Sequence, residues 1–268
     1  MQEKEKIREH IQKNYAAVAQ NKGADVGGCC SSSGCCGTQT VSLLDASAMI
    51  GYTAEEVGQA PEGANMALGC GNPTAIAGLK SGEVVLDLGS GGGFDCFLAH
   101  RQVGPSGYVI GVDMTPDMVR LSRKHAHEAG IENMDFRLGE IEHLPVADAS
   151  VDVIISNCVI NLSVDKAQVF KDAYRVLKPG GRIAASDVVA TAALPEAMKA
   201  DLRLVASCIS GAEYVEDLRI MMEKAGFEEI RLEPKDNSRE LISSWAPGHK
   251  AEDYVASYLI EARKPLKV

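Results

Sequence analysis

A short apolar stretch that ends in a cluster of glycines constrains the fold of this chain more than any other feature. Residues 84–88 (VVLDL) form an apolar run, which is typical of a strand buried on both faces in a parallel sheet. Four glycines follow within five residues, at positions 89–93, and a helical pattern begins at Phe94. Glycines let the backbone approach a ligand that a Cβ atom would keep away. Strand, turn and helix together therefore predict a nucleotide-binding loop.

The residue after the next expected strand supports this interpretation. A second apolar strand is expected at residues 108–112, and Asp113 follows it, where a carboxylate can accept hydrogen bonds from ribose hydroxyls. The dinucleotide pattern would need a third glycine at position 94, which is Phe94. The pattern from Asp87 to Gly93 is instead D-x-G-x-G-x-G, which resembles motif I of the S-adenosylmethionine-dependent methyltransferases.

Composition excludes several classes of partner. The chain has 268 residues, 46% of them hydrophobic, so it can bury a full core. Its net charge of −10 argues against nucleic acid, which requires a basic surface. No apolar run approaches the roughly 20 residues of a membrane span, and residues 16–19 are too short for a signal-peptide core. Six scattered histidines make a histidine metal site unlikely. We expect a cytoplasmic protein without nucleic-acid or membrane partners.

Strands and helices alternate from residue 82 onward. Further strands are expected at 134–138, 151–156 and 182–188, with helices between them, and this alternation predicts a parallel sheet. The chain should end with helices near 195–205 and 214–225 and strands at 229–233 and 254–262. We divide it into an N-terminal helix and Gly/Ser/Cys-rich leader (1–72), a cofactor-binding core (73–190) and a C-terminal part that completes the sheet and the substrate site (191–268).

Eight cysteines need an explanation, and in a reducing compartment they favour thiols over structural disulfides. Cys158 comes just after the fourth expected strand, at the sheet edge where ligands bind. Cys70 precedes a short helix expected at 73–79 that should start near the same edge, and a return of Cys208 to that edge is plausible. Cys70 and Cys158 lie in loop-like contexts with little core to fill, so we favour a functional role. For Cys96 we favour a small buried hydrophobe.

Several longer motifs resemble arsenite methyltransferases, over residues 65–230. They are LGCGNP at 68–73, DLGSG at 87–91, GVDMT at 111–115, SNCVINL at 156–162 and CISGA at 208–212. The leader is also similar to that of microbial members. The resemblance implies an α/β fold: a doubly wound, mostly parallel, Rossmann-like class I methyltransferase sheet with an N-terminal extension and a C-terminal α+β region.

The resemblance also implies roles for individual residues. Asp113 and Met114 would hold the ribose and adenine side of S-adenosylmethionine, and Glu140 and Ile141 would meet the adenine edge. The remaining cofactor positions are Asp87, Gly89, Gly91 and Asn157, of which the glycines and Asn157 would accommodate the methionine moiety. Cys70, Cys158 and Cys208 match the arsenic-binding thiolates. A fourth, helper cysteine does not map uniquely, and its candidates are Cys29, Cys30, Cys35 and Cys36.

The residue types fit the implied chemistry, methylation of arsenite and then of methylarsenite for detoxification. Trivalent arsenic is soft and takes thiolate ligands. Its lone pair would attack the sulfonium methyl group, so no general base is needed, and proximity and alignment can supply roughly 7–11 kcal/mol of the barrier at best. A thioredoxin-like or glutathione-like thiol reductant is implied as a partner.

Two alternatives remain open at this stage. A methyltransferase acting on a carbon or oxygen of a small molecule explains the glycine loop but not the three cysteines. A non-enzymatic thiol protein that binds soft metals explains the cysteines but not the loop. The leader could also bind zinc, although C-C-x₄-C-C lacks the usual C-x₂-C spacing.

Overall fold

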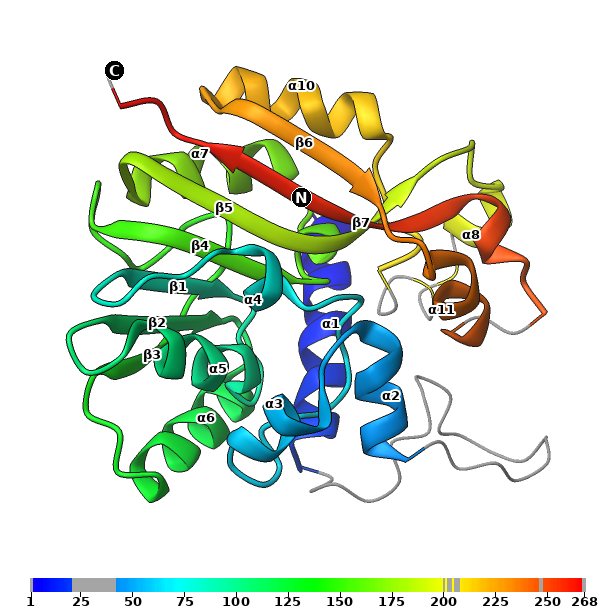
Figure 1. Cartoon of the computed structure of the whole chain (residues 1–268). Helices are drawn as coiled ribbons and strands as arrows, with labels where there is room; N and C mark the ends of the chain where they lie inside the picture. The colour runs from blue at the N-terminus through cyan, green and yellow to red at the C-terminus, as the bar shows by residue number, and fades with distance from the viewer. Residues whose placement is uncertain are drawn as a thin grey trace.

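The computed structural model contains one sheet of seven strands in the order β3-β2-β1-β4-β5-β7-β6 (Figure 1). The structure describes residues 2–20, 42–199, 201, 204, 208–245 and 248–266. The pairings among β1 to β5 are parallel, and β7 runs antiparallel to both β5 and β6. The doubly wound, mostly parallel α/β fold expected from the sequence is therefore confirmed.

The strand bounds agree with the expected ranges, except at β5. The strands are β1 Val84–Leu88, β2 Tyr108–Asp113, β3 Met134–Leu138, β4 Val151–Asn157, β5 Leu177–Ala190, β6 Glu228–Pro234 and β7 Val255–Arg263. Strand β5 begins at Leu177 rather than Arg182, because Leu177 already pairs with Val151 of β4 ahead of the Pro-Gly-Gly turn. The alternation of the sequence could not reveal this early pairing.

Helices connect the parallel strands and extend the fold at both ends. They are α1 Gln2–Gln20, α2 Leu43–Ile50, α3 Ala54–Gln59, α4 Pro73–Ile76, α5 Phe94–Val103, α6 Pro116–Glu128, α7 Lys166–Val176, α8 Glu196–Lys199, α10 Val215–Ala225 and α11 Ser238–Trp245. Short 3₁₀ turns lie at Ile160–Leu162, before α7, and at Ala251–Asp253, before β7. Part of the helix expected at 195–205 lies outside the described residues, and α11 was not expected from the sequence.

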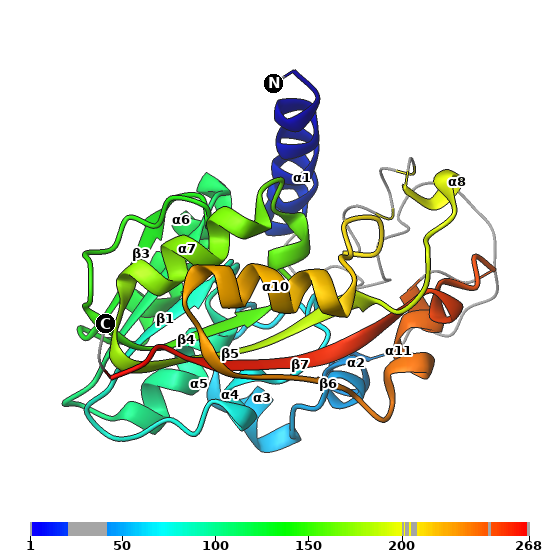
Figure 2. The same ribbon diagram turned by 90° about the horizontal axis from the view of Figure 1, so that it is seen from above.

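Separate apolar clusters cover the two faces of the sheet. One joins the strands to α7 and α10 through residues such as Phe170 and Met222. Another lies against α5 and α6 and contains Phe97 and Phe136. Figure 2 shows α7 and α10 on one side of the sheet and α4 and α5 on the other. A sheet buried on both faces explains why its strands read as continuous apolar runs.

A third apolar cluster lies beyond the sheet edge and joins segments that are far apart in the sequence. It brings residues of α2, α11 and the ends of β5 and β7 together with Cys70, Cys158 and Cys208. The sheet order reverses between β1 and β4, so the loops after these two strands diverge at their carboxyl ends. No described helix is long and apolar enough to cross a membrane.

We expect Phe170→Ala to lower the free energy of unfolding by about 3–5 kcal/mol. The side chain of Phe170, on α7, is fully buried in the cluster that joins the sheet to α7 and α10, and its removal would leave a cavity. Urea denaturation measures the change. Ile220→Ala, on the exposed side of α10, is the matched control and should change the stability by less than about 0.5 kcal/mol. Equal losses would mean that this cluster is not the core of the domain.

Candidate active site

A cavity opens at the carboxyl ends of β1, β2 and β4. Of the cofactor positions expected from the sequence, seven line it: Asp87, Gly89, Gly91, Asp113, Met114, Ile141 and Asn157. Glu140 is not among the lining residues, whereas Glu142, two positions later, does line the cavity. The loops after three neighbouring strands therefore build one site, where parallel sheets usually bind ligands.

The glycine loop after β1 leaves room for a ligand at one position and for a side chain at another. Gly91 has a φ of +51°, and a Cβ atom added there would meet no atom within 4 Å. A Cβ at Gly89 would instead collide with the side chain of Val159. Gly89 therefore serves close packing of the loop after β4, and Gly91 is the glycine that exposes backbone to the cavity. This open cradle fits a nucleotide cofactor.

Asp113, at the end of β2, fixes the shape of the same loop. Its carboxylate accepts hydrogen bonds from the backbone N–H of Gly91 at 2.9 Å and from that of Thr115 at 2.8 Å. Burial raises the pKa of Asp113, and these two backbone donors act in the opposite direction. Because a carboxylate oxygen can accept more than one hydrogen bond, Asp113 retains capacity for ribose hydroxyls.

Helix α1 forms part of the wall of this cavity. Arg8 and Tyr15 line it, and Arg8 forms ion pairs with Glu140 at 3.3 Å and Glu142 at 3.7 Å. Gln12 donates a hydrogen bond from Nε2 to the carbonyl of Met114 at 3.1 Å. The sequence predicts an N-terminal helix but gives no sign that its polar residues reach the cofactor positions.

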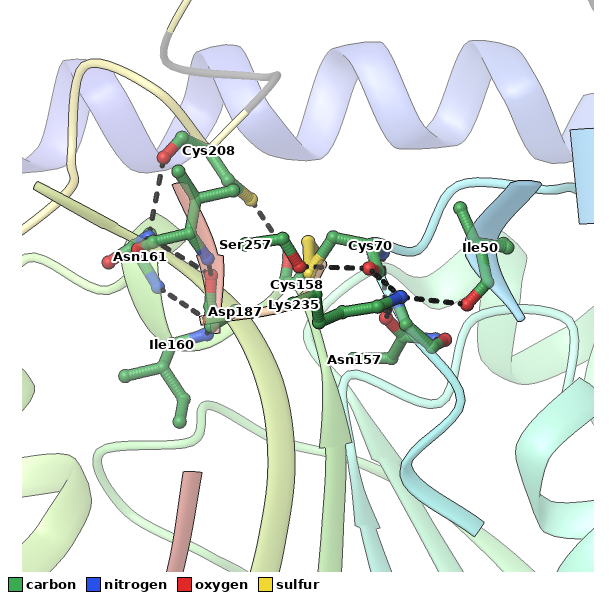
Figure 3. The surroundings of a disulfide bond; sticks show 12 residues. Ile50, Cys70, Asn157, Cys158, Ile160, Asn161, Asp187, Cys208, Lys235 and Ser257 are labelled. Carbon is green, nitrogen blue, oxygen red and sulfur yellow. Dashed lines mark hydrogen bonds between the residues drawn. A yellow bond between two sulfur atoms is a disulfide. The ribbon is translucent and has the colours of Figure 1, made fainter. Parts of the chain in front are cut away.

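The three cysteines expected to act together do converge. Cys70 and Cys158 are joined by a disulfide, with their Cα atoms 5.9 Å apart (Figure 3). The Sγ of Cys208 donates a hydrogen bond to the carbonyl of Cys158 at 2.9 Å. The sequence favoured free thiols over disulfides, whereas the structure shows Cys70 and Cys158 in the oxidised form. The candidate helpers at positions 29, 30, 35 and 36 lie outside the described residues.

Burial and backbone conformation set these cysteines apart. All three are at most 5% exposed, although the sequence context of Cys70 and Cys158 indicated loops with little core. Cys158 has a φ of +55° and Cys208 a φ of +60°, in the left-handed region that non-glycine residues seldom adopt. Such conformations cost about 1–3 kcal/mol each and cluster at functional sites.

Polar side chains hold the two cysteine loops in place. Asp187 accepts hydrogen bonds from the backbone N–H groups of Ile160 at 2.8 Å and Asn161 at 3.3 Å. Burial raises the pKa of Asp187 to about 6. Lys235 and Ser257, from the C-terminal segments, each donate to the carbonyl of Cys70 at 3.0 Å. Figure 3 shows these residues surrounding the sulfur atoms.

Asn157, the last residue of β4, connects the cavity to Cys70. Its Oδ1 accepts hydrogen bonds from the backbone N–H groups of Cys70 at 2.9 Å and Gly71 at 3.3 Å. Its Nδ2 donates to the hydroxyl of Tyr52 at 2.9 Å, and Tyr52 donates to Asp95 at 2.6 Å. The loop that carries Cys70 is therefore attached to the wall of the cavity.

Cys96 has a different environment from the other described cysteines. Its side chain is completely buried in the cluster under α5, and its Sγ donates to Asp87 at 3.2 Å. Burial and the nearby carboxylates of Asp87 and Asp95 raise the pKa of this thiol. A protonated, buried thiol is a poor nucleophile and metal ligand, which agrees with the structural role favoured from the sequence.

Sequence reasoning did not single out Tyr52, Asp95, Asp187, Arg8 or Glu142. For Asp95 there was a signal, because it lies directly after the glycine loop in the first turn of the helix. The others come from segments whose position at the cavity depends on tertiary packing. Chemically, the site combines a nucleotide cradle, a negatively charged wall and three cysteines that could bind a soft ion once reduced.

Comparisons with known proteins agree with one another. A family model described as "Methyltransferase domain" matches residues 79–226. An arsenite methyltransferase of Halobacterium salinarum is 48% identical over 270 residues, which cover 98% of this chain and 68% of that protein. An arsenite methyltransferase of Aquipseudomonas alcaligenes is 40% identical over 234 residues, which cover 84% of this chain and 63% of that protein. The chain thus spans about two thirds of the length of these relatives.

A solved structure of another arsenic methyltransferase is also similar to this chain. The crystal structure of an arsenic(III) S-adenosylmethionine methyltransferase from Chlamydomonas reinhardtii is 36% identical in sequence. The match has a TM-score of 0.59 and covers 82% of this chain and 72% of that chain. A phosphoethanolamine N-methyltransferase of Haemonchus contortus has a TM-score of 0.61 at 21% identity, which indicates a shared fold only.

We expect Asn157→Ala to release the loop that carries Cys70. The variant loses the acceptor for two backbone N–H groups, so hydrogen exchange at Cys70 and Gly71 should become faster. Asn133→Ala is the matched control. The side chain of Asn133 likewise makes two hydrogen bonds to the backbone, as a donor to the carbonyls of Gly104 and Gly107, but it lies outside this loop. Unchanged protection in Asn157→Ala, or the same loss in the control, would contradict the role assigned to Asn157.

Proposed function

Because the chain belongs to the S-adenosylmethionine-dependent arsenite methyltransferases, we propose that Cys70, Cys158 and Cys208, once reduced, hold trivalent arsenic as thiolates beside the cofactor. The observation that carries this proposal is the convergence of the three cysteines next to the nucleotide cradle. Cys158 itself lines the cavity. A methyltransferase that acts on a carbon or oxygen of a small molecule would not need this arrangement of sulfur atoms.

The residues of the cavity fit the cofactor. Gly91 offers open backbone, Asp113 would bind ribose hydroxyls, and Met114 and Ile141 would contact the adenine. Asn157 contacts the Cys70 loop and would line the pocket of the methionine part, together with Asp87, which also lines the cavity. When bound, S-adenosylmethionine supplies a methyl group on a positively charged sulfur. The chain has only to align that group with the arsenic, which is the kind of catalysis that positioning provides.

Reduction must come before arsenic binding. The Cys70–Cys158 disulfide exchanges with two molecules of a thiol, which leaves two protein thiols and one external disulfide. A thioredoxin-like or glutathione-like reductant meets this need. Arsenite then exchanges its three hydroxides for three thiolates, and each thiol proton leaves with a hydroxide as water. No general base is needed, since the arsenic lone pair carries no proton.

Methyl transfer oxidises the arsenic from the trivalent to the pentavalent state. Its return to the trivalent state requires two electrons, which a pair of thiols supplies when it forms a disulfide. The closeness of Cys70 and Cys158 supports such a role for this pair. We extend the proposal to methylarsenite as a second substrate, because it has two exchangeable hydroxides and needs only two thiolates. One of the leader cysteines at positions 29, 30, 35 and 36 would serve as a helper.

We expect Asp113→Ala to weaken cofactor binding by about 1–3 kcal/mol. The variant loses the carboxylate that shapes the glycine loop and would accept ribose hydroxyls. Calorimetric titration with S-adenosylhomocysteine measures the change, and circular dichroism checks the fold. Unchanged affinity in a folded variant would remove Asp113 from the cofactor site.

Cys158→Ser and Cys208→Ser should each abolish methylation of arsenite and methylarsenite while cofactor affinity stays within about twofold. Serine keeps the size of cysteine and offers a hard oxygen that arsenic does not prefer. The assay incubates the protein with arsenical, S-adenosylmethionine and a thiol, and then measures the methylated species. Cys96→Ser is the matched control and should remain active, since Cys96 contacts Asp87 within the core. An inactive control together with an active Cys158→Ser would overturn the assignment.

Cys70→Ser should slow methylation of arsenite far more than that of methylarsenite. A third thiolate replaces the last labile hydroxide of arsenite, whereas methylarsenite has carbon at that position. The variant with all four leader cysteines changed to serine should show the same preference, and it keeps α1, which contacts the cavity. The measurement is the initial rate on each substrate. Equal losses on both substrates would show that these cysteines do not act by supplying a third ligand.

A further inference from the structure

Three groups that can bind a metal ion meet near the carboxyl ends of β4 and β5. The Sγ atoms of Cys158 and Cys208 and a carboxylate oxygen of Asp187 all lie within 4.8 Å of one another. The three residues are buried, with exposed fractions of 5% or less. Among the residues that the structure describes, this trio has such a geometry, and Cys70 is not part of it. The carboxylate beside two thiols has no place in a site made of three cysteines.

Backbone contacts hold the trio together. Asn157 pairs with Ser186 in the parallel register of β4 and β5. The N–H of Cys158 donates to the carbonyl of Ser186 at 2.8 Å, so Cys158 lies beside Asp187. The Sγ of Cys208 in turn donates to the carbonyl of Cys158 at 2.9 Å (Figure 3). The relative positions of the three groups therefore depend on adjacent strands.

The hydrogen-bond donors of Asp187 are neutral and leave one of its oxygens adaptable. The carboxylate accepts from the backbone N–H groups of Ile160 at 2.8 Å, Asn161 at 3.3 Å and Val188 at 2.8 Å. It also accepts from the side-chain Nδ2 of Asn161 at 3.0 Å. This Nδ2 contacts the carbonyls of Val188 and Cys208 as well, so it can leave Asp187 and stay paired. The oxygen that it leaves can bind a cation.

We propose that Cys158, Cys208 and Asp187 of the reduced protein bind a divalent cation of borderline softness, such as Zn²⁺. Reduction of the Cys70–Cys158 disulfide by an external thiol frees the Sγ of Cys158. When the cation binds, the two thiols release their protons to the solvent, and nothing is oxidised or reduced. The cation then offsets the charge of two thiolates and one carboxylate.

The ligand types separate this ion from arsenic. Zinc binds thiolate sulfur at about 2.3 Å and carboxylate oxygen at about 2.0–2.2 Å, so its ligand atoms lie roughly 3.3–3.8 Å apart. Rotation of the freed Cys158 side chain can close the trio from 4.8 Å to this spacing. Trivalent arsenic prefers sulfur to the hard oxygen of Asp187 and would take Cys70 as its third ligand.

The two ions would share Cys158 and Cys208, so only one of them can be bound at a time. Zinc should therefore inhibit methylation in competition with arsenite and not in competition with S-adenosylmethionine. This consequence rests on the proposed function, whereas zinc binding itself does not.

The experiment uses the full chain with its four leader cysteines changed to serine, because those thiols could bind zinc themselves. The protein is reduced with a phosphine, and Zn²⁺ alone is titrated in competition with a chromophoric chelator. We expect one zinc ion per chain. Replacement of zinc by Co²⁺ should give a thiolate-to-cobalt absorption with the intensity of two sulfur ligands.

Two variants of this protein should respond in opposite ways. Asp187→Asn should weaken zinc binding at least about tenfold, an effect that even residues supporting a metal ligand commonly have. Arsenite binding, measured by equilibrium dialysis, should weaken much less. Cys70→Ser should lose arsenite affinity and keep zinc affinity within about twofold.

Asp152→Asn is the matched control. Asp152 also accepts from a backbone N–H, that of Val84 at 2.8 Å, but it lies at the opposite end of β4 from Cys158. This variant should bind zinc as tightly as its parent.

A three-sulfur cobalt spectrum, or loss of zinc affinity in Cys70→Ser, would overturn the inference, because zinc would then occupy the arsenic ligands. Equal weakening of zinc and arsenite in Asp187→Asn would also overturn it, in favour of a purely structural role for Asp187. The cobalt spectrum and Cys70→Ser decide the question if Asp187→Asn does not fold. A protein that binds zinc as expected but does not methylate arsenite would count against the proposed function alone.

Discussion

The arrangement of the site depends on the hydrogen bonds made by the side-chain amide of Asn157. One end of this amide accepts from the backbone of the Cys70 loop, and the other end donates toward Tyr52 and the carbonyl of Gly71. Because an amide combines a donor and an acceptor in a short rigid group, it can bridge two loops that no backbone pairing joins. It ends β4 and precedes Cys158, so a sheet strand sets its position. The wall of the cavity and the Cys70 loop are thereby both attached to a strand inside the sheet.

The surroundings of the cysteines suit the redox chemistry and the arsenic binding that we propose for them. Their burial in an apolar cluster would exclude water from a soft ion bound there, and the polar contacts of Asp187, Lys235 and Ser257 satisfy the nearby backbone. Two of the three cysteines adopt left-handed backbone conformations. Strain of this kind persists only where neighbouring contacts hold it, and here those contacts come from residues distant in the sequence. The loops are thus fixed before a ligand arrives, which lowers the entropic cost of binding.

The acidic side chains around the cavity differ in the charge of their partners. Arg8 of α1 pairs with Glu140 and Glu142, whereas the hydrogen-bond partners of Asp87 and Asp95 within the described part of the chain are neutral.

The sequence by itself determined the fold class, the family and the cofactor. These follow from local patterns: an apolar strand, a glycine turn and an acidic residue after the next strand have the same consequences wherever they occur. It also placed Cys158 and Cys70 near one edge of the sheet and made a return of Cys208 to that edge plausible, and the resemblance to the family implied that the three act together. Tertiary structure alone decided that Cys70 and Cys158 are close enough for a disulfide, that Val159 fills the space at Gly89 and that α1 lines the cavity. These features depend on contacts between segments whose separation in the sequence bears no relation to their distance in space. Local propensity carries no information about such contacts, so only the packed chain could reveal them.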